Sequence, residues 1–313
     1  MKNTIKIFLL LAVVAQFSCV KDPFKEFEEG DWNNERSILN IKFENQVGAA
    51  EIVRDGDNTG TITVGINVDA VPDFSNIALS NLVLSYDAAS SVKVGEALNF
   101  ENASNSAVIT VTSPTGMKRD YTVIAEPFTE TILGTYAISN LVVWGGTGPE
   151  YGGGAVLAMT DKPWVWPENG GPAAEMDNTI TLELTGFTDA GNSFGTIVNN
   201  AGADGAYADF QYVLDPPTNV NGFYRKIPAG EGQWERNYAT GMVTFTFADG
   251  TTTQGVFVES STTVDLGFDQ TKTVDNQAFQ FELNGTDDWE KIYSDYDKFV
   301  RKPRTFWIDL KRQ

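Results

Sequence analysis

The sequence predicts an all-β protein of two domains, and three observations lead to this prediction. Runs of alternating apolar and polar residues recur along the chain after residue 36. Turn-forming pairs separate these runs, and Asp249-Gly250 is the strongest hairpin signal among them. The 313 residues, 42% of them hydrophobic, are enough for two ordinary domains. We therefore expect a β-sandwich followed by a larger antiparallel β domain.

Residues 1–18 have the pattern of a secretory signal peptide. Lys2 and Lys6 precede an apolar run over residues 7–15, which is too short to span a bilayer. Ser18 before Cys19 resembles the cleavage site of bacterial lipoproteins, and this resemblance implies lipidation of Cys19 and attachment to the membrane through that lipid anchor. The alternative is an ordinary signal cut elsewhere. The acidic, apolar-poor residues 19–36 then predict a tether.

Residues 37–126 are predicted to form the first domain. Short apolar stretches lie around residues 38–43, 61–68, 107–112 and 121–125, with turn sequences between them. Strands at this spacing within about 90 residues are typical of an Ig-like β-sandwich.

The same domain carries a family resemblance. Pro72-Asp73-Phe74-Ser75-Asn76-Ile77 is followed by Leu98-Asn99-Phe100, by Ala107-Val108-Ile109-Thr110-Val111 and by Asp120-Tyr121-Thr122-Val123. This pattern resembles the bacterial Ig-like module near the anchor of surface glycan-binding lipoproteins of Bacteroidota. The resemblance implies a spacer at the outer membrane, within a polysaccharide-utilisation system. Its implied partners are an outer-membrane glycan transporter and the lid-like binding protein of that transporter.

Residues 132–313 are predicted to form the larger β domain. Alternation is clear over residues 179–185, 209–214, 243–247 and 279–283, as in half-buried antiparallel strands. These runs fit either an antiparallel β-sandwich or a barrel.

One amphipathic helix is expected near the C-terminus. Aromatic and apolar residues over 289–300 follow helical spacing, Thr286 is placed as the N-cap, and Pro303 ends the helix. A strand over residues 306–310 follows. A helix leading into a terminal strand, in a domain opened by Gly134-Thr135-Tyr136, resembles lipocalin-like barrels, and a sandwich stays the alternative.

Composition excludes several classes of function. The net charge of −20 repels phosphates, so we expect no nucleic-acid partner. The chain has no histidine and a single cysteine, which excludes Ser-His-Asp and Cys-His nucleophile systems, histidine-containing zinc sites and internal disulfides. These absences favour binding over catalysis.

Exposed aromatic residues in the second domain are the candidate ligand site. Six of the seven tryptophans lie beyond residue 143. Trp164 and Trp166 stand two residues apart between prolines, which predicts that both lie on one face of an extended edge segment. A flat indole matches the apolar face of a sugar, and nearby polar side chains match its hydroxyls. The candidate ligand-binding residues are Trp164, Trp166, Trp144, Tyr151, Trp234, Tyr238, Asp161, Glu168 and Asn169.

Two further expectations concern tryptophan. A second cluster of Tyr224, Arg225, Trp234, Arg236, Asn237 and Tyr238 is expected to line the other side of the site. Trp307 points opposite to Phe306 and Ile308, so it is either covered by the helix or exposed. For any single tryptophan, a place in the core is the competing interpretation.

No metal site or cofactor is predicted. Calcium is the alternative, because Asp55, Asp57 and Asn58 before Gly60 have partial calcium-loop spacing, but the bidentate glutamate is missing and a hairpin turn is favoured.

The sequence thus predicts a non-catalytic, surface-anchored protein that binds a neutral glycan. The alternatives are a structural or adhesive surface lipoprotein without a sugar site, a glycoside hydrolase using two carboxylates, and a lipid-carrying barrel.

Overall fold

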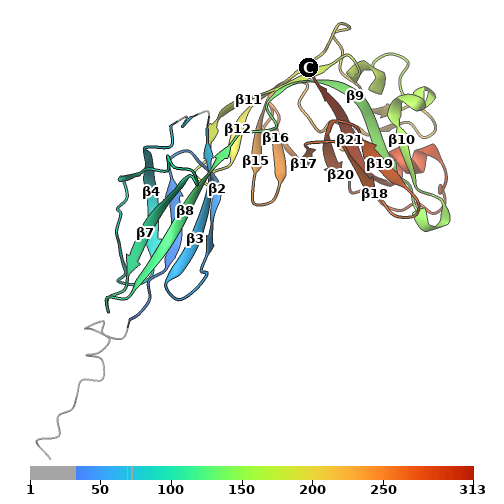
Figure 1. The fold of residues 1–313 in the computed structure, drawn as a ribbon. Coiled ribbons are helices and arrows are strands. Elements are labelled where there is room, and N and C mark those ends of the chain that lie inside the picture. The colour runs from blue at the N-terminus through green and yellow to red at the C-terminus, as the bar shows by residue number, and fades with distance from the viewer. Residues whose placement is uncertain (1–32, 69, 72) are drawn as a thin grey trace, which may run out of the picture. The chain divides into compact units, whose positions relative to one another are not determined.

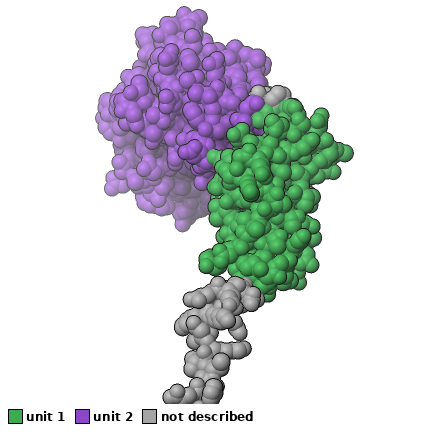
Figure 2. Space-filling view, turned by 90° about the vertical axis from the view of Figure 1, so that its left-hand side faces the viewer, with its two compact units in different colours: residues 1–44, 50–64, 71–126 green, residues 45–49, 65–70, 127–313 purple. Residues whose placement is uncertain are grey.

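The computed structural model describes residues 33–68, 70, 71 and 73–313. The chain is all-β and forms two compact units (Figures 1 and 2). One unit contains residues up to 44 together with 50–64 and 71–126; the other contains 45–49, 65–70 and 127–313. The predicted signal peptide, the lipidation site Cys19 and most of the tether lie outside the described residues, as does Pro72.

The first unit is a β-sandwich, as the strand spacing predicts. Alternate residues of its strands point inward, and Phe43 and Phe100 meet edge-on inside it, with ring centroids 5.6 Å apart. One sheet has the order β1 (Ile38–Phe43), β4 (Ile77–Leu84), β6 (Ala97–Leu98). The other has the order β2 (Gln46–Val53), β3 (Thr59–Asn67), β8 (Lys118–Phe128), β7 (Ser106–Thr112), β5 (Ala89–Ser90).

The second unit is a closed eight-stranded barrel, so the barrel alternative holds over the sandwich. Each strand pairs antiparallel with the next along the chain, and the last strand returns to the first and closes the sheet. A short ninth strand, β10 (Ala155–Ala158), pairs with the second half of β9. The barrel strands are β9 (Gly134–Gly145), β11 (Thr179–Phe187), β12 (Ser193–Asn200), β15 (Gly230–Asn237), β16 (Met242–Thr246), β17 (Thr252–Val258), β20 (Gln277–Glu282) and β21 (Pro303–Arg312).

Alternation along the strands sets the barrel interior. In β16, Val243 and Phe245 are buried while their neighbours are not, and the predicted hairpin to β17 is present. Gly250 has φ +81° in that turn, a value that L side chains rarely adopt. The interior is filled by aromatic rings, as in the contact of Phe245 with Phe279 at 5.0 Å between centroids. The barrel core is therefore a packed, largely aromatic interior.

Trp307 lies on the outer face of the barrel and is fully buried there. The hairpin of β18 (Thr262–Asp265) and β19 (Thr271–Val274) covers it, because Val274 and Leu266 pack into the same cluster. Sequence reasoning left a choice between a helical cover and exposure, and the cover is a β-hairpin.

The C-terminal helix is shorter than the aromatic spacing predicts. Asp297–Arg301 forms a helix of the π type, residues 295 and 296 before it are α-helical, and residues 289–294 form turns and bends. The expected N-cap Thr286 donates its backbone N–H to Arg301 O at 2.7 Å, and the Asp288 N–H donates to Thr147 Oγ1 at 2.7 Å. The Thr147 hydroxyl thus takes the N–H that Thr286 was expected to cap, and Tyr293, with φ +76°, interrupts the helical stripe.

Three of the four long connections of the barrel emerge at one end, which we call the loop end, and the fourth, residues 259–276 with the β18–β19 hairpin, leaves the other end. In an antiparallel meander every second connection leaves the same end. Here these connections are residues 146–178, interrupted by β10, together with 201–229, 247–251 and 283–302 (Figure 1). Within the described part of the chain, no helix has the length and apolarity required to cross a bilayer.

Candidate functional site

A pocket of about 1020 Å³ lies at the loop end. One wall consists of three short 3-10 turns at Met159–Asp161, Pro163–Val165 and Pro172–Glu175, and Asp204, Ala206 and Val213 come from the connection after β12. Proline starts two of these turns, where its fixed φ favours helical geometry and its missing N–H costs nothing. The size of the pocket and its mostly apolar lining, with few polar groups, suit a small-molecule or oligomeric ligand.

Trp164 is the exposed aromatic residue of the pocket. Its side chain is 57% exposed and lines the cavity. The ammonium of Lys162 lies 5.2 Å from the ring centroid, and the same Nζ pairs with Asp295 Oδ1 at 3.1 Å. The Lys162 ammonium and the turn that contains Trp164 hold the indole at the surface, where its flat face is available to a ligand.

Trp166 points the other way, and the prediction that both tryptophans share one face is wrong. Residues 163–165 form a 3-10 turn, in which residues three apart share a face, whereas the two-residue spacing requires an extended strand. Trp166 is 4% exposed and donates its Nε1–H to Met159 O at 3.0 Å. Its ring packs in the barrel interior against Tyr212, Tyr224 and Phe299, and Trp166 also lines the pocket.

The polar rim of the pocket consists of exposed side chains. Glu168 and Asn169 line it as candidates from the sequence, whereas Asp161 is exposed but lies outside the lining. Asp204 also lines the pocket, and sequence reasoning missed it. The turn-rich stretch around Gly202 and Gly205 marked a loop there, but nothing in the sequence placed that loop beside residues 163–174.

A buried carboxylate supports the pocket from behind. Glu175 accepts hydrogen bonds from the Ala208 N–H at 2.9 Å and from Asn178 Nδ2 at 2.8 Å, and it pairs with Arg225 Nη1 at 2.7 Å. Arg225, a predicted member of the second cluster, also lies 5.2 Å from the ring centroid of Phe210. These bonds tie the turn over residues 172–175 to the connection after β12, so both pocket walls are fixed.

The second cluster does not line this pocket, and that prediction is wrong. Trp234 is 1% exposed inside the barrel, with its Nε1 3.0 Å from Thr196 O. Tyr224 is buried and donates its hydroxyl to Phe299 O at 2.7 Å. Arg236 and Tyr238 lie at the opposite end of the barrel, because β15 runs away from the loop end. Asn237, which ends that strand, is likewise outside the lining.

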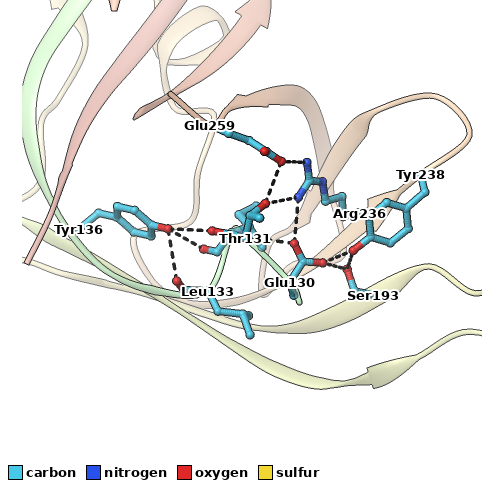
Figure 3. A network of polar contacts seen from close by, with 9 residues as sticks. Glu130, Thr131, Leu133, Tyr136, Ser193, Arg236, Tyr238 and Glu259 are labelled. Carbon is cyan, nitrogen blue, oxygen red and sulfur yellow. Dashed lines mark hydrogen bonds and ion pairs between the residues drawn. The ribbon is translucent and has the colours of Figure 1, made fainter. Parts of the chain in front are cut away.

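Arg236 and Tyr238 belong to a polar network around buried Glu130 (Figure 3). Arg236 pairs with Glu130 Oε1 at 2.9 Å and also with Glu259, and the Tyr238 hydroxyl donates to Glu130. Burial, followed by the bond to Glu130, raises the pKa of Tyr238. The hydrogen bond from Arg236 lowers the pKa of Glu259. The network fastens residues 130 and 131 to the barrel strands, which is a structural role.

Trp144 and Tyr151 lie outside the pocket. Trp144 is half-buried on the outer face of the barrel, against the Trp307 cluster, and Arg304 lies 5.3 Å from its ring centroid. Tyr151 is exposed beside Trp289 and Tyr293. The sequence assigned the last two residues to the buried stripe of the expected helix, and their exposure is a finding of the structure.

No group of three or more potential metal-ligating side chains occurs in the described ranges. Near the calcium-loop spacing, Asp55 accepts a hydrogen bond from Thr61 Oγ1 at 2.7 Å, and the guanidinium of Arg36 donates to the Asp57 carbonyl at 2.6 Å. These contacts are those of a closed turn.

Comparisons with known proteins give little likeness. No family model and no curated protein matches the chain. A solved structure from Bacteroides fragilis, of a protein described as secreted, is similar to part of it with a TM-score of 0.23 and 13% identity. The similarity covers 31% of this chain and 98% of that chain. Any functional assignment must therefore come from the residues of the site.

Proposed function

We propose that this protein is a non-catalytic, surface-anchored carbohydrate-binding protein that captures a neutral polysaccharide at the loop end of its barrel. One observation carries the proposal: Trp164 is exposed at a pocket whose rim holds Glu168, Asn169 and Asp204. In this proposal the protein serves a glycan-uptake system through its lipid anchor, with an outer-membrane transporter and its lid-like binding protein as partners.

The pocket chemistry supports a sugar as ligand. A pyranose ring presents C–H groups on its faces and hydroxyls around its edge. The indole of Trp164 offers an apolar plate for the face, and the carboxylates of Glu168 and Asp204 accept hydrogen bonds from hydroxyls. Asn169 both donates and accepts, which suits hydroxyls of either orientation.

Charge selects the class of glycan. The net charge of −20 and the two acidic residues on the rim oppose uronic or sulfated chains, so a neutral glycan is the matching partner. The first unit, a sandwich for which the proposal requires no ligand, acts as a spacer between the anchor and the barrel.

Titration of intrinsic fluorescence with neutral glycans tests the proposal. The probes are cello-, xylo-, manno- and malto-oligosaccharides and their parent polysaccharides. We expect quenching or a spectral shift with at least one series. Calorimetric titration, which needs no reporter indole, should show a loss of at least about tenfold in affinity in Trp164→Ala. Tyr86→Ala is the matched control, because Tyr86 is a 73% exposed aromatic residue of the other unit.

The same samples separate the alternatives. A structural or adhesive lipoprotein gives no response to any glycan. A glycoside hydrolase shortens the oligosaccharide during a long incubation, and Glu168→Gln or Asp204→Asn abolishes that cleavage. Retention without cleavage is the result expected here.

A further inference from the structure

A second group of exposed aromatic residues lies at the loop end. Tyr151, Trp289 and Tyr293 are 65%, 57% and 59% exposed, and we call these three residues the aromatic platform. They come from connections about 140 residues apart in the chain. Three large aromatic side chains left this exposed in one place are unusual for a soluble surface and indicate an interaction site.

Specific contacts hold the platform together. The rings of Tyr151 and Trp289 meet edge-on with centroids 6.0 Å apart, and the Tyr293 hydroxyl donates to Tyr151 O at 3.2 Å. Gly148 has φ +58°, and a Cβ there would lie 2.9 Å from the indole of Trp289. The glycine-rich loop therefore lets the indole lie against its backbone, and the aromatic plates are fixed before any ligand arrives.

The platform is adjacent to the Trp164 pocket. Lys162 connects them, because its Nζ lies 5.2 Å from the Trp164 ring centroid and 3.1 Å from Asp295 Oδ1. Asp295 is two residues from Tyr293, a stretch of chain that spans at most about 7 Å. Within the same segment, the Lys298 ammonium donates to Tyr293 O at 2.7 Å.

We infer that the aromatic platform binds the continuation of the glycan chain whose first units occupy the Trp164 pocket. The inference rests on the proposed function and narrows its substrate class to linear neutral polysaccharides. Exposed Glu150 and Glu290 stand next to platform residues in the chain and supply acceptors for sugar hydroxyls. Once a glycan occupies the Trp164 pocket, its contact with the aromatic platform is intramolecular. Chains long enough to reach both subsites therefore bind more tightly than short ones.

Chain-length dependence of binding tests this inference. The full-length protein is titrated with cello-, xylo-, manno- and malto-oligosaccharides from disaccharide to heptasaccharide. For the double variant Tyr151→Ala with Trp289→Ala, we expect unchanged affinity for the shortest oligosaccharide that the wild type binds and a loss of about tenfold or more for the longest. Tyr86→Ala is the control, and an unchanged melting temperature verifies folding.

A second measurement reports on the platform directly. In Trp164→Phe, Trp289 is the exposed tryptophan that remains among the described residues. The longest oligosaccharide should protect its fluorescence from acrylamide quenching, whereas the shortest should not. Trp164→Phe with Trp289→Phe gives the background signal to subtract.

The outcomes separate this inference from the proposed function. Equal affinity of the wild type and the platform variant at every length, with Trp164→Ala impaired, overturns the platform alone. An equal loss at every length also overturns it, because the platform would then act on the pocket and not on chain length. Absence of binding by the wild type, or full binding by Trp164→Ala, overturns the proposed function as well.

Discussion

The rings of Trp166 and Phe299 meet edge-on with centroids 5.2 Å apart. Phe299 belongs to the short C-terminal helix, so this contact joins the pocket wall to the last connection of the barrel. Trp166 is thereby a core residue, although Trp164, two positions earlier, is exposed. Of two tryptophans only two positions apart, one therefore packs in the core and the other is exposed at the surface.

Substituting the two tryptophans separately should reveal this division. Trp166→Ala removes a buried indole and should lower the free energy of unfolding by about 3–5 kcal/mol. Trp164→Ala removes an exposed side chain and should change it by less than about 0.5 kcal/mol. Urea denaturation followed by circular dichroism measures both. Equal losses for the two variants would contradict the assignment.

The Glu130 network should be a large contributor to barrel stability. Glu130→Ala leaves Arg236 without its buried partner, because the Glu130 side chain is 1% exposed, and should cost about 3–5 kcal/mol in the free energy of unfolding. Glu259→Ala, at the exposed side of the same arginine, should cost less than about 1 kcal/mol. If urea denaturation showed comparable losses of stability for Glu130→Ala and Glu259→Ala, burial of the carboxylate would not determine how much each ion pair contributes.

Stability should depend on pH through Glu259. Its pKa is lowered in the folded protein from the ordinary 4.5, chiefly by the hydrogen bond from Arg236. The stabilisation is therefore full above about pH 4.5 and is lost as the pH falls through the lower folded value. The stability difference between wild type and Glu259→Gln should be present at pH 7 and shrink in strong acid. If the stability difference between wild type and Glu259→Gln grew below pH 4, the folded-state pKa of Glu259 would have to be raised and not lowered.

The ion pair under the outer hairpin offers a fourth test. Lys272 Nζ lies 2.8 Å from Asp309 Oδ2, with both side chains largely buried, and burial raises the pKa of Asp309. Lys272→Met strands the carboxylate and should destabilise the barrel by about 3–5 kcal/mol in thermal or urea unfolding. The control is Lys272→Met with Asp309→Leu, which should recover most of that loss, because no buried charge remains.

Alternation along the chain predicted the barrel strands because it records which side chains face the core. The pattern over residues 179–185 and 243–247 appears as β11 and β16, and the Asp249-Gly250 turn joins β16 to β17. Period-two burial is local, so it can be read from local sequence.

Side-chain spacing predicted the helix and the tryptophan pair less well. The stripe over residues 289–300 has helical spacing, yet Tyr293 adopts φ +76°, which interrupts a right-handed helix, and Thr147, 141 positions away, takes the Asp288 N–H that Thr286 was expected to cap. The pair at 164 and 166 was interpreted as extended, and a 3-10 turn rotates the second indole inward. The first failure involves a contact from far along the chain, which local sequence does not specify, and the second arose because Pro163 suits the start of a 3-10 turn as well as an extended segment.

The sequence by itself determined the all-β class, the inward and outward faces of the strands, and the acidic net charge, since these follow from residue type and period. Tertiary structure alone decided which aromatic residues are exposed and which loops lie side by side. Closing β21 onto β9 brings the connections 146–178, 201–229 and 283–302 together at the loop end, so Asp204 reaches the Trp164 pocket and Tyr151 reaches Trp289. Exposure depends on what packs against a residue from elsewhere in the chain, and that information is nonlocal.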